Sequence, residues 1–136
     1  MAERINGYVA YNEALEWGVI RNGEVSIGGV NYKPTIPVRA DVAADIERIM
    51  KMSVSETYKA IKYMYYAMRK QLFWDGNKRT AILSANYLLL QKGKGILINH
   101  EKHLEQWNVL LTEFYETNYD QAIIDWTYEN CILNKV

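Results

Sequence analysis

Apolar residues recur at a spacing of three or four along most of the chain, which is the spacing that places them on one face of an α-helix. Polar and charged residues fill the positions between them. The helices are predicted within residues 6–23, 38–52, 53–70, 78–91, 104–114 and 123–131. This pattern indicates an all-α fold, a compact helical bundle.

Five of the predicted helices have an apolar stripe on one face. Asn22 and Gly23 are expected to end the first helix, and Ser55 is a favoured residue for capping the start of the third. The residues of these stripes are Tyr8, Tyr11, Leu15 and Ile20; Val42, Ile46 and Ile49; Tyr58, Ile61, Tyr65 and Met68; Leu104, Trp107, Leu111 and Phe114; and Ile123, Trp126 and Cys131.

The segment from Lys78 to Gln91 differs from the other helices because apolar residues occur on nearly every side of it. A helix that is apolar all round is usually buried, so we expect this one at the centre of the bundle. Gly93 and Gly95 are expected to end it, and a short extended stretch, residues 96–99, follows.

Alternating apolar residues surround Gly28 and Gly29, which predicts a small β-hairpin with a tight glycine turn. The alternating residues are Val25, Ile27, Val30 and Tyr32, and Pro34 and Pro37 stop any extension. The exposed edge of such a hairpin could pair with an extended segment of another protein. A plain surface hairpin is the alternative.

Composition narrows the class of protein. The chain has 136 residues, 49% hydrophobic and 24% charged, which fits one domain spanning residues 1–136. The formal net charge is zero, which argues against direct binding of nucleic acid. Neither a signal peptide nor an apolar run long enough to cross a membrane is found, so we expect a cytoplasmic protein. Cys131 is alone, and we expect it to be a small buried hydrophobe.

The connection between the third and fourth helices, residues 71–77 (the motif loop), combines groups that suit an anion. Gly76 permits unusual backbone geometry and Asn77 is a favoured N-cap. Lys78 and Arg79 follow in the first helical turn, where a cation costs about 0.3–1 kcal/mol against the helix dipole. A phosphate bound by the N–H groups of the helix start would reverse that cost.

Asp75 would repel a phosphate unless a cation lay between them, and Mg²⁺ commonly bridges a carboxylate and substrate phosphates. These residues together suggest a nucleotide–Mg²⁺ site. The loop alone fits equally well with a capped helix in which Asp75 neutralises Lys78 or Arg79. Phe73 and Trp74 are expected to be structural, one of them anchoring the loop in the core.

At these residues the chain resembles the Fic/Doc family, whose signature is H-x-F-x-[D/E]-G-N-[G/K]-R. The matching residues are Phe73, Asp75, Gly76, Asn77, Lys78 and Arg79. The upstream "IGGVNYKPTIP" resembles the hairpin of that family, its flap, together with the Pro-containing exit that follows it. The resemblance implies the Fic fold for most of the chain.

The resemblance also implies an activity. Fic proteins mostly transfer AMP from ATP to a Ser, Thr or Tyr hydroxyl of a target protein, and Doc-type members transfer phosphate. Asp75 would hold Mg²⁺, Gly76 and Asn77 would form an anion hole, Lys78 and Arg79 would bind phosphates, and Phe73 would fix the loop. The flap would align the target through Ile27, Gly28, Gly29, Val30, Tyr32 and Lys33. A toxin–antitoxin setting, with an antitoxin or regulatory partner, is a further family implication.

The chain departs from the family pattern at the general base. Gln71 stands where the family has histidine, and a glutamine amide can orient a hydroxyl but cannot take its proton near neutral pH. His100 and His103 lie after the fourth helix, where we expect surface positions. Ile82 replaces a second arginine of many members. The [S/T]-x-x-x-E-[G/N] motif of self-inhibited members is absent, and "DWTYEN", the nearest stretch, has Asp125 where Ser or Thr belongs.

Three hypotheses follow from Gln71. The chain is a slow or unusual Fic-type transferase, or a non-catalytic Fic fold that binds nucleotide or a protein partner, or a Fic enzyme in which glutamine was deliberately substituted for histidine to remove activity. The sequence alone fits all three.

Overall fold

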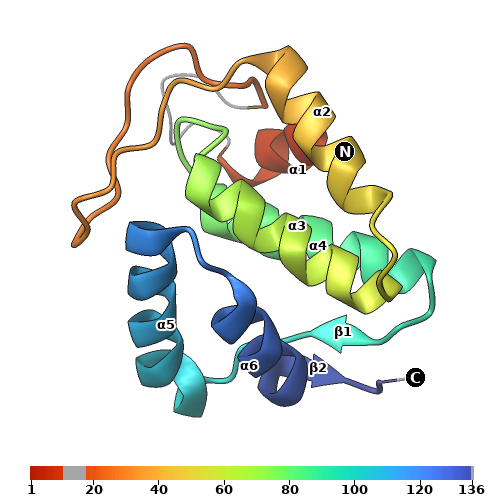
Figure 1. The fold of residues 1–136 in the computed structure, drawn as a ribbon. Coiled ribbons are helices and arrows are strands. Elements are labelled where there is room, and N and C mark those ends of the chain that lie inside the picture. The colour runs from red at the N-terminus through yellow and green to blue at the C-terminus, as the bar shows by residue number, and fades with distance from the viewer. Residues whose placement is uncertain (11–17, 136) are drawn as a thin grey trace.

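The computed structural model describes residues 1–10 and 18–135 of the chain. The described residues are mainly helical (Figure 1). The α-helices are α1 (Ala2–Val9), α2 (Arg39–Met50), α3 (Glu56–Lys70), α4 (Asn77–Gln91), α5 (Leu104–Thr117) and α6 (Gln121–Cys131), with a short 3₁₀ helix η1 (Glu101–His103). The predicted all-α fold, a compact helical bundle, is confirmed.

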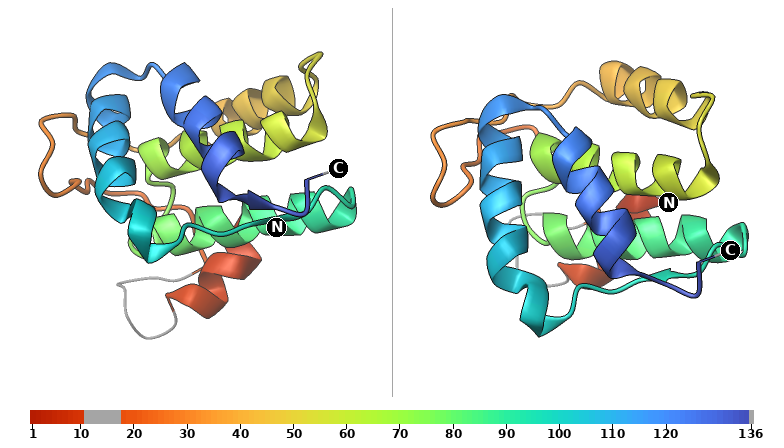
Figure 2. Two further views of the ribbon diagram at one scale, coloured as in Figure 1. Left: turned by 90° about the horizontal axis from the view of Figure 1, so that it is seen from below. Right: turned by 60° about the horizontal axis from the view of Figure 1, so that its bottom comes forward.

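Helices α3 and α4 form the centre of the bundle. The left view of Figure 2 shows α4 between α1 and α3, while α2 lies against α3 on the other side. Ser55 caps α3 as predicted, because its Oγ accepts a hydrogen bond of 3.1 Å from the Tyr58 N–H. Ile61 and Met68, on the predicted stripe of α3, are fully buried.

The centre of the core contains a buried polar cluster. The Tyr65 hydroxyl lies 2.6 Å from the Thr127 Oγ1 and accepts a hydrogen bond of 3.0 Å from the Trp107 Nε1. Burial raises the pKa of Tyr65 well above its ordinary value, so the hydroxyl stays neutral. The cluster joins α3, α5 and α6 and fixes the orientation of the helix that leads into the motif loop.

The prediction that α4 is buried on every side is wrong. Ala81, Ala85 and Leu89 are buried, but Leu83, Tyr87 and Leu90 are 50%, 49% and 66% exposed. The exposed residues recur at spacings of four and three, so α4 has one apolar face that the described residues leave uncovered. The apolar residues on all sides of α4 therefore predicted its central position correctly, although not all of these residues are buried.

The prediction for the first helix is wrong at its C-terminal end. Helix α1 ends at Val9, and Ile20 lies in an irregular segment. Tyr8 is 82% exposed. Tyr11 and Leu15, the other two members of that predicted stripe, lie outside the described residues.

The predicted β-hairpin around Gly28 and Gly29 is also wrong. A turn is present, with Gly29 at φ +81°, but the structure assigns no strand within residues 18–38. The small antiparallel sheet is elsewhere: β1 (Ile96–Leu97) pairs with β2 (Ile132–Leu133). Residues 27–33, still called the flap, form an irregular segment that protrudes beside α5 (Figure 1).

Cys131 at the end of α6 is buried, as expected, and burial raises the pKa of its thiol to about 11. Within the described ranges, no helix combines the length and the apolar character needed to cross a membrane.

Candidate functional site

The motif loop joins α3 to α4 through two residues in the left-handed region. Gln71 ends α3 at φ +49°, and Gly76 precedes α4 at φ +70°. A left-handed conformation is common for glycine and uncommon for glutamine. The two residues together reverse the chain so that α3 and α4 pack side by side.

The side-chain amide of Gln71 is engaged at both ends. Its Nε2 donates a hydrogen bond of 2.7 Å to the Met68 carbonyl, and its Oε1 accepts one of 3.1 Å from the Asn77 Nδ2. The amide therefore closes the loop internally, linking the last turn of α3 to the first residue of α4.

Asn77 is largely buried and belongs to α4 itself. Its Oδ1 accepts a hydrogen bond of 2.9 Å from the Phe73 N–H, and its Nδ2 donates one of 2.8 Å to the Phe73 carbonyl. The prediction that Asn77 caps α4 is wrong, because its amide holds the loop instead. Gly76 occupies the N-cap position, and no side chain among the described residues caps this helix start.

Asp75 is exposed at the bend of the loop, whereas Gly76, the next residue, is buried against α1. The Asp75 Oδ1 accepts a hydrogen bond of 2.8 Å from the Gly76 N–H. A Cβ atom on Gly76 would come within 2.7 Å of the Val9 Cγ1, so both the backbone angle and the close approach of α1 require glycine. Asp75 is exposed, which leaves its carboxylate accessible to solvent.

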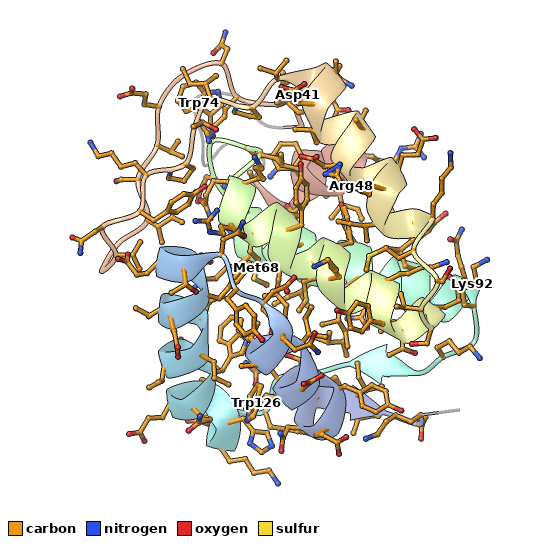
Figure 3. All side chains as sticks on the ribbon, in the orientation of Figure 1. Asp41, Arg48, Met68, Trp74, Lys92 and Trp126 are labelled. Carbon is orange, nitrogen blue, oxygen red and sulfur yellow. The ribbon has the colours of Figure 1, made fainter. Side chains whose placement is uncertain are left out.

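Phe73 and Trp74 hold the loop from two sides. Phe73 is buried in the core. Trp74 is half-buried, and its ring packs closely against Gly23. A Cβ atom on Gly23 would lie only 2.4 Å from the Trp74 Cη2. Figure 3 labels Trp74 near the irregular segment that follows residue 18.

Lys78 and Arg79 are exposed in the first turn of α4. The Lys78 Nζ lies 5.3 Å from the centroid of the Trp107 ring, a cation–π contact that directs this cation toward α5. Both positive charges thus lie near a helix start, where the dipole disfavours them.

Sequence analysis missed Arg21, which is 1% exposed. Its guanidinium donates hydrogen bonds to the carbonyls of Gly23 (2.7 Å), Thr35 (2.6 Å), Lys70 (3.1 Å) and Gln71. Burial lowers the pKa of Arg21. Because it holds carbonyls on both sides of the flap and at the end of α3, Arg21 connects the flap with the motif loop.

Sequence analysis also missed Asn6, which is fully buried. Its Nδ2 donates hydrogen bonds to the Asp75 carbonyl (2.8 Å) and the Thr80 Oγ1 (3.2 Å), and its Oδ1 accepts one of 2.9 Å from the Gly18 N–H. The only hint in the sequence was a polar residue within the predicted first helix.

The flap residues lie apart from the motif loop. Gly28, Gly29 and Lys33 are exposed, Ile27 and Val30 pack partly against the core, and the Tyr32 ring lies 3.7 Å below the Arg69 guanidinium. The structure thus brings Gln71, Phe73, Asp75, Gly76 and Asn77 together and connects the flap to them through Arg21.

His100 is exposed just before η1, and His103 is half-buried at the end of η1. His103 contacts Trp126 edge to face, with 5.6 Å between the ring centroids. No group of three or more His, Cys, Asp or Glu side chains suited to a metal ion occurs in the part of the chain that the structure describes. A metal at the motif loop would therefore depend on a single protein carboxylate.

In a comparison with protein-family models, the model of the Fic/DOC family matches residues 4–89. The matched region begins in α1 and extends through α2, α3, the motif loop and most of α4. No curated protein matches the chain.

Proposed function

Because the chain belongs to the Fic/DOC family, we propose that it binds ATP with Mg²⁺ at the motif loop and has the site of a protein AMP-transferase with impaired catalysis. The observation that carries the proposal is the Gln71 amide, which is bound to Met68 and Asn77 at the position of the general base.

The start of α4 supports the phosphate part of the proposal. It is preceded by a glycine in the left-handed region and lacks a side-chain cap from the described residues. Backbone N–H groups at such a helix start attract anions, and the dipole adds to the attraction. Lys78 and Arg79 would then stand beside a negative ligand, which removes the unfavourable interaction with the dipole.

Asp75 fits the proposed Mg²⁺. An exposed single carboxylate suits a metal ion that keeps several waters and takes further oxygen ligands from the nucleotide. When bound, the ion would neutralise phosphate charge. Turning Asp75 outward would also break its hydrogen bond with the Gly76 N–H, which would become available to a phosphate oxygen.

Gln71 explains why catalysis would be impaired. A neutral amide has no proton affinity useful near neutral pH, and both of its polar atoms are already hydrogen-bonded. Loss of a general base reduces rate by about 10²–10⁴-fold. A non-catalytic binding protein is the second candidate, and the same closed arrangement of Gln71 favours it.

The test is transfer of label from α-labelled ATP, with Mg²⁺, to the proteins of a cell lysate. We expect Gln71→His to label at least one protein far more strongly than the unmodified chain. Comparable labelling by both would show that Gln71 supports catalysis, and absence of labelling by both would contradict AMP transfer. Parallel γ-labelled ATP distinguishes transfer of phosphate.

Calorimetry tests nucleotide binding separately from catalysis. We expect ATP·Mg²⁺ to bind with a Kd on the order of millimolar or tighter, and we expect Asp75→Ala and Arg79→Ala to weaken it. Lys92→Ala, at the opposite end of α4, is the matched control. Equal affinities for all variants would show that Asp75 and Arg79 do not form a nucleotide site.

A further inference from the structure

The side chain of Glu116, near the end of α5, binds the backbone of the flap. The Glu116 Oε1 accepts hydrogen bonds from the N–H groups of Asn31 (2.6 Å) and Tyr32 (3.1 Å). In a β-strand, successive residues point to opposite sides, so two neighbouring N–H groups cannot meet one acceptor. The bend that brings them together explains why the predicted hairpin is absent.

Two adjacent N–H groups that converge on one oxygen form a small anion-binding concavity. Its occupant in this chain is a carboxylate, and that carboxylate is exposed to solvent. Because the contact is exposed, water and other anions can compete with Glu116 for the two N–H groups. The flap therefore has a carboxylate site that another carboxylate could take over from Glu116.

Arg69 lies next to this site. Its guanidinium stacks on the Tyr32 ring at 3.7 Å, and its Nε donates a hydrogen bond of 3.1 Å to the Tyr115 carbonyl. Arg69 also lines a cleft of about 370 Å³ between α2, α3 and the connection from α5 to α6. Arg69 thus belongs to both the lining of the cleft and the contact with Tyr32 of the flap.

Cations outnumber carboxylates in this cleft. Its charged lining residues are Arg48, Lys62, Arg69, Lys70, Asp45 and Asp120. The carboxylates are already paired, Asp45 with Arg48 and Asp120 with Lys62. Among the described residues, Arg69 and Lys70 have no carboxylate partner, so the end of the cleft nearest the flap has the uncompensated positive charge.

We propose that the flap and this cleft form a docking surface for an acidic segment of the target protein. One carboxylate of that segment replaces Glu116 on the Asn31 and Tyr32 N–H groups, and a second lies near Arg69 and Lys70. The inference rests on the proposed function and on the alignment of the target by the flap that the family resemblance implies, and it adds the chemical class of segment recognised. Glu116 acts as the internal occupant until the target binds.

The test measures, by fluorescence anisotropy without ATP, the binding of a short Glu-rich peptide and of its counterpart with Gln at each Glu. We expect the Glu peptide to bind more tightly. Lys70→Gln should weaken its binding by about three- to tenfold. Lys92→Gln is the matched control; Figure 3 shows Lys92 at the end of the molecule away from the flap.

Glu116→Gln should tighten binding of the Glu peptide by about threefold or more, because the internal competitor is weakened. Glu113→Gln is the control, since it removes the same charge one turn earlier from an exposed position of α5. Equal effects of the two changes would mean that the tighter binding comes from the loss of one negative charge and not from release of the Asn31 and Tyr32 N–H groups. That result would overturn the proposal.

Hydrogen exchange provides a measurement that needs no ligand. The amides of Asn31 and Tyr32 should exchange faster in Glu116→Gln than in Glu113→Gln, and unchanged exchange would contradict the contact. Displacement of the Glu peptide by inorganic phosphate at constant ionic strength would indicate a phosphate site and overturn docking of a protein segment.

The outcomes separate this inference from the proposed function. If the peptide behaves as expected but Gln71→His transfers no label, AMP transfer fails and acidic recognition stands. If Gln71→His labels a target but neither Glu116→Gln nor Lys70→Gln changes that labelling or the peptide affinity, the docking surface fails and transfer stands.

Discussion

The motif loop and the flap are both connections without regular structure, and they differ in how their backbones are held. The motif loop is fixed from within the protein: Asn77 holds Phe73, Asn6 holds Asp75 and Arg21 holds Gln71. The flap is held by Glu116 and by the stacking of Tyr32 on Arg69, at exposed or half-exposed positions.

This difference indicates a division of roles. Buried hydrogen bonds are costly to leave unmade, so the motif loop has one well-defined geometry, as a site for small charged groups requires. Exposed contacts have little energy, so the flap can change its partner at small cost. The following substitutions test the contrast, in order of expected effect.

Arg21→Met should have the largest effect, because it removes the buried guanidinium that donates hydrogen bonds to four carbonyls. We expect a loss of at least about 3 kcal/mol in the free energy of unfolding, measured in urea. Arg39→Met, which removes an exposed pair with Glu3, should cost less than about 1 kcal/mol. Similar losses for both would show that Arg21 does not support the loop.

Gly76→Ala and Gly29→Ala compare the two regions at matched backbone angles. Both glycines have positive φ, so each substitution introduces strain of about 1–2 kcal/mol. A Cβ on Gly76 also meets Val9, whereas nothing lies within 4 Å of one on Gly29. Thermal unfolding should therefore show a clearly larger loss for Gly76→Ala; an equal loss would contradict the close packing of α1 against the loop.

Tyr32→Ala should have the smallest effect on stability. It removes the ring beneath Arg69, a contact that contributes about 0.5–1 kcal/mol at partly exposed sites. Unfolding in urea should show a loss within that range, while amide exchange in residues 27–33 becomes faster. A loss as large as that of Arg21→Met would mean that the flap is part of the core.

Local patterns were enough to predict much of the fold. The cap at Ser55, the end of α3 at Lys70 and the position of the motif loop depend on residues close in sequence. Gly76 was identified from the backbone freedom of glycine and from the signature that it and its neighbours match. The residues of the loop could thus be named from the sequence, although the hydrogen bonds of their side chains could not.

The predictions that failed have a common cause: the residues concerned bind partners that lie far away in the sequence. Arg21 is held by Lys70 and Gln71, about 50 residues away, and Asn6 by residues about 70 away. Glu116 lies 85 residues from Asn31, so alternation around Gly28 and Gly29 suggested strands that this contact prevents. Asn77 looked like a cap because a favoured cap residue does not reveal which backbone group it will bind.

Arg21 also has a consequence for the order in which the chain folds. A guanidinium loses its hydration when it is buried, so Arg21 gains nothing by entering the protein until its carbonyl acceptors have converged. Two of these acceptors, Lys70 and Gln71, exist in place only after α3 has formed and its last turn is complete. We therefore expect the segment containing Arg21 to dock late and cooperatively, so that a nascent chain completes its candidate site only in the final step of folding.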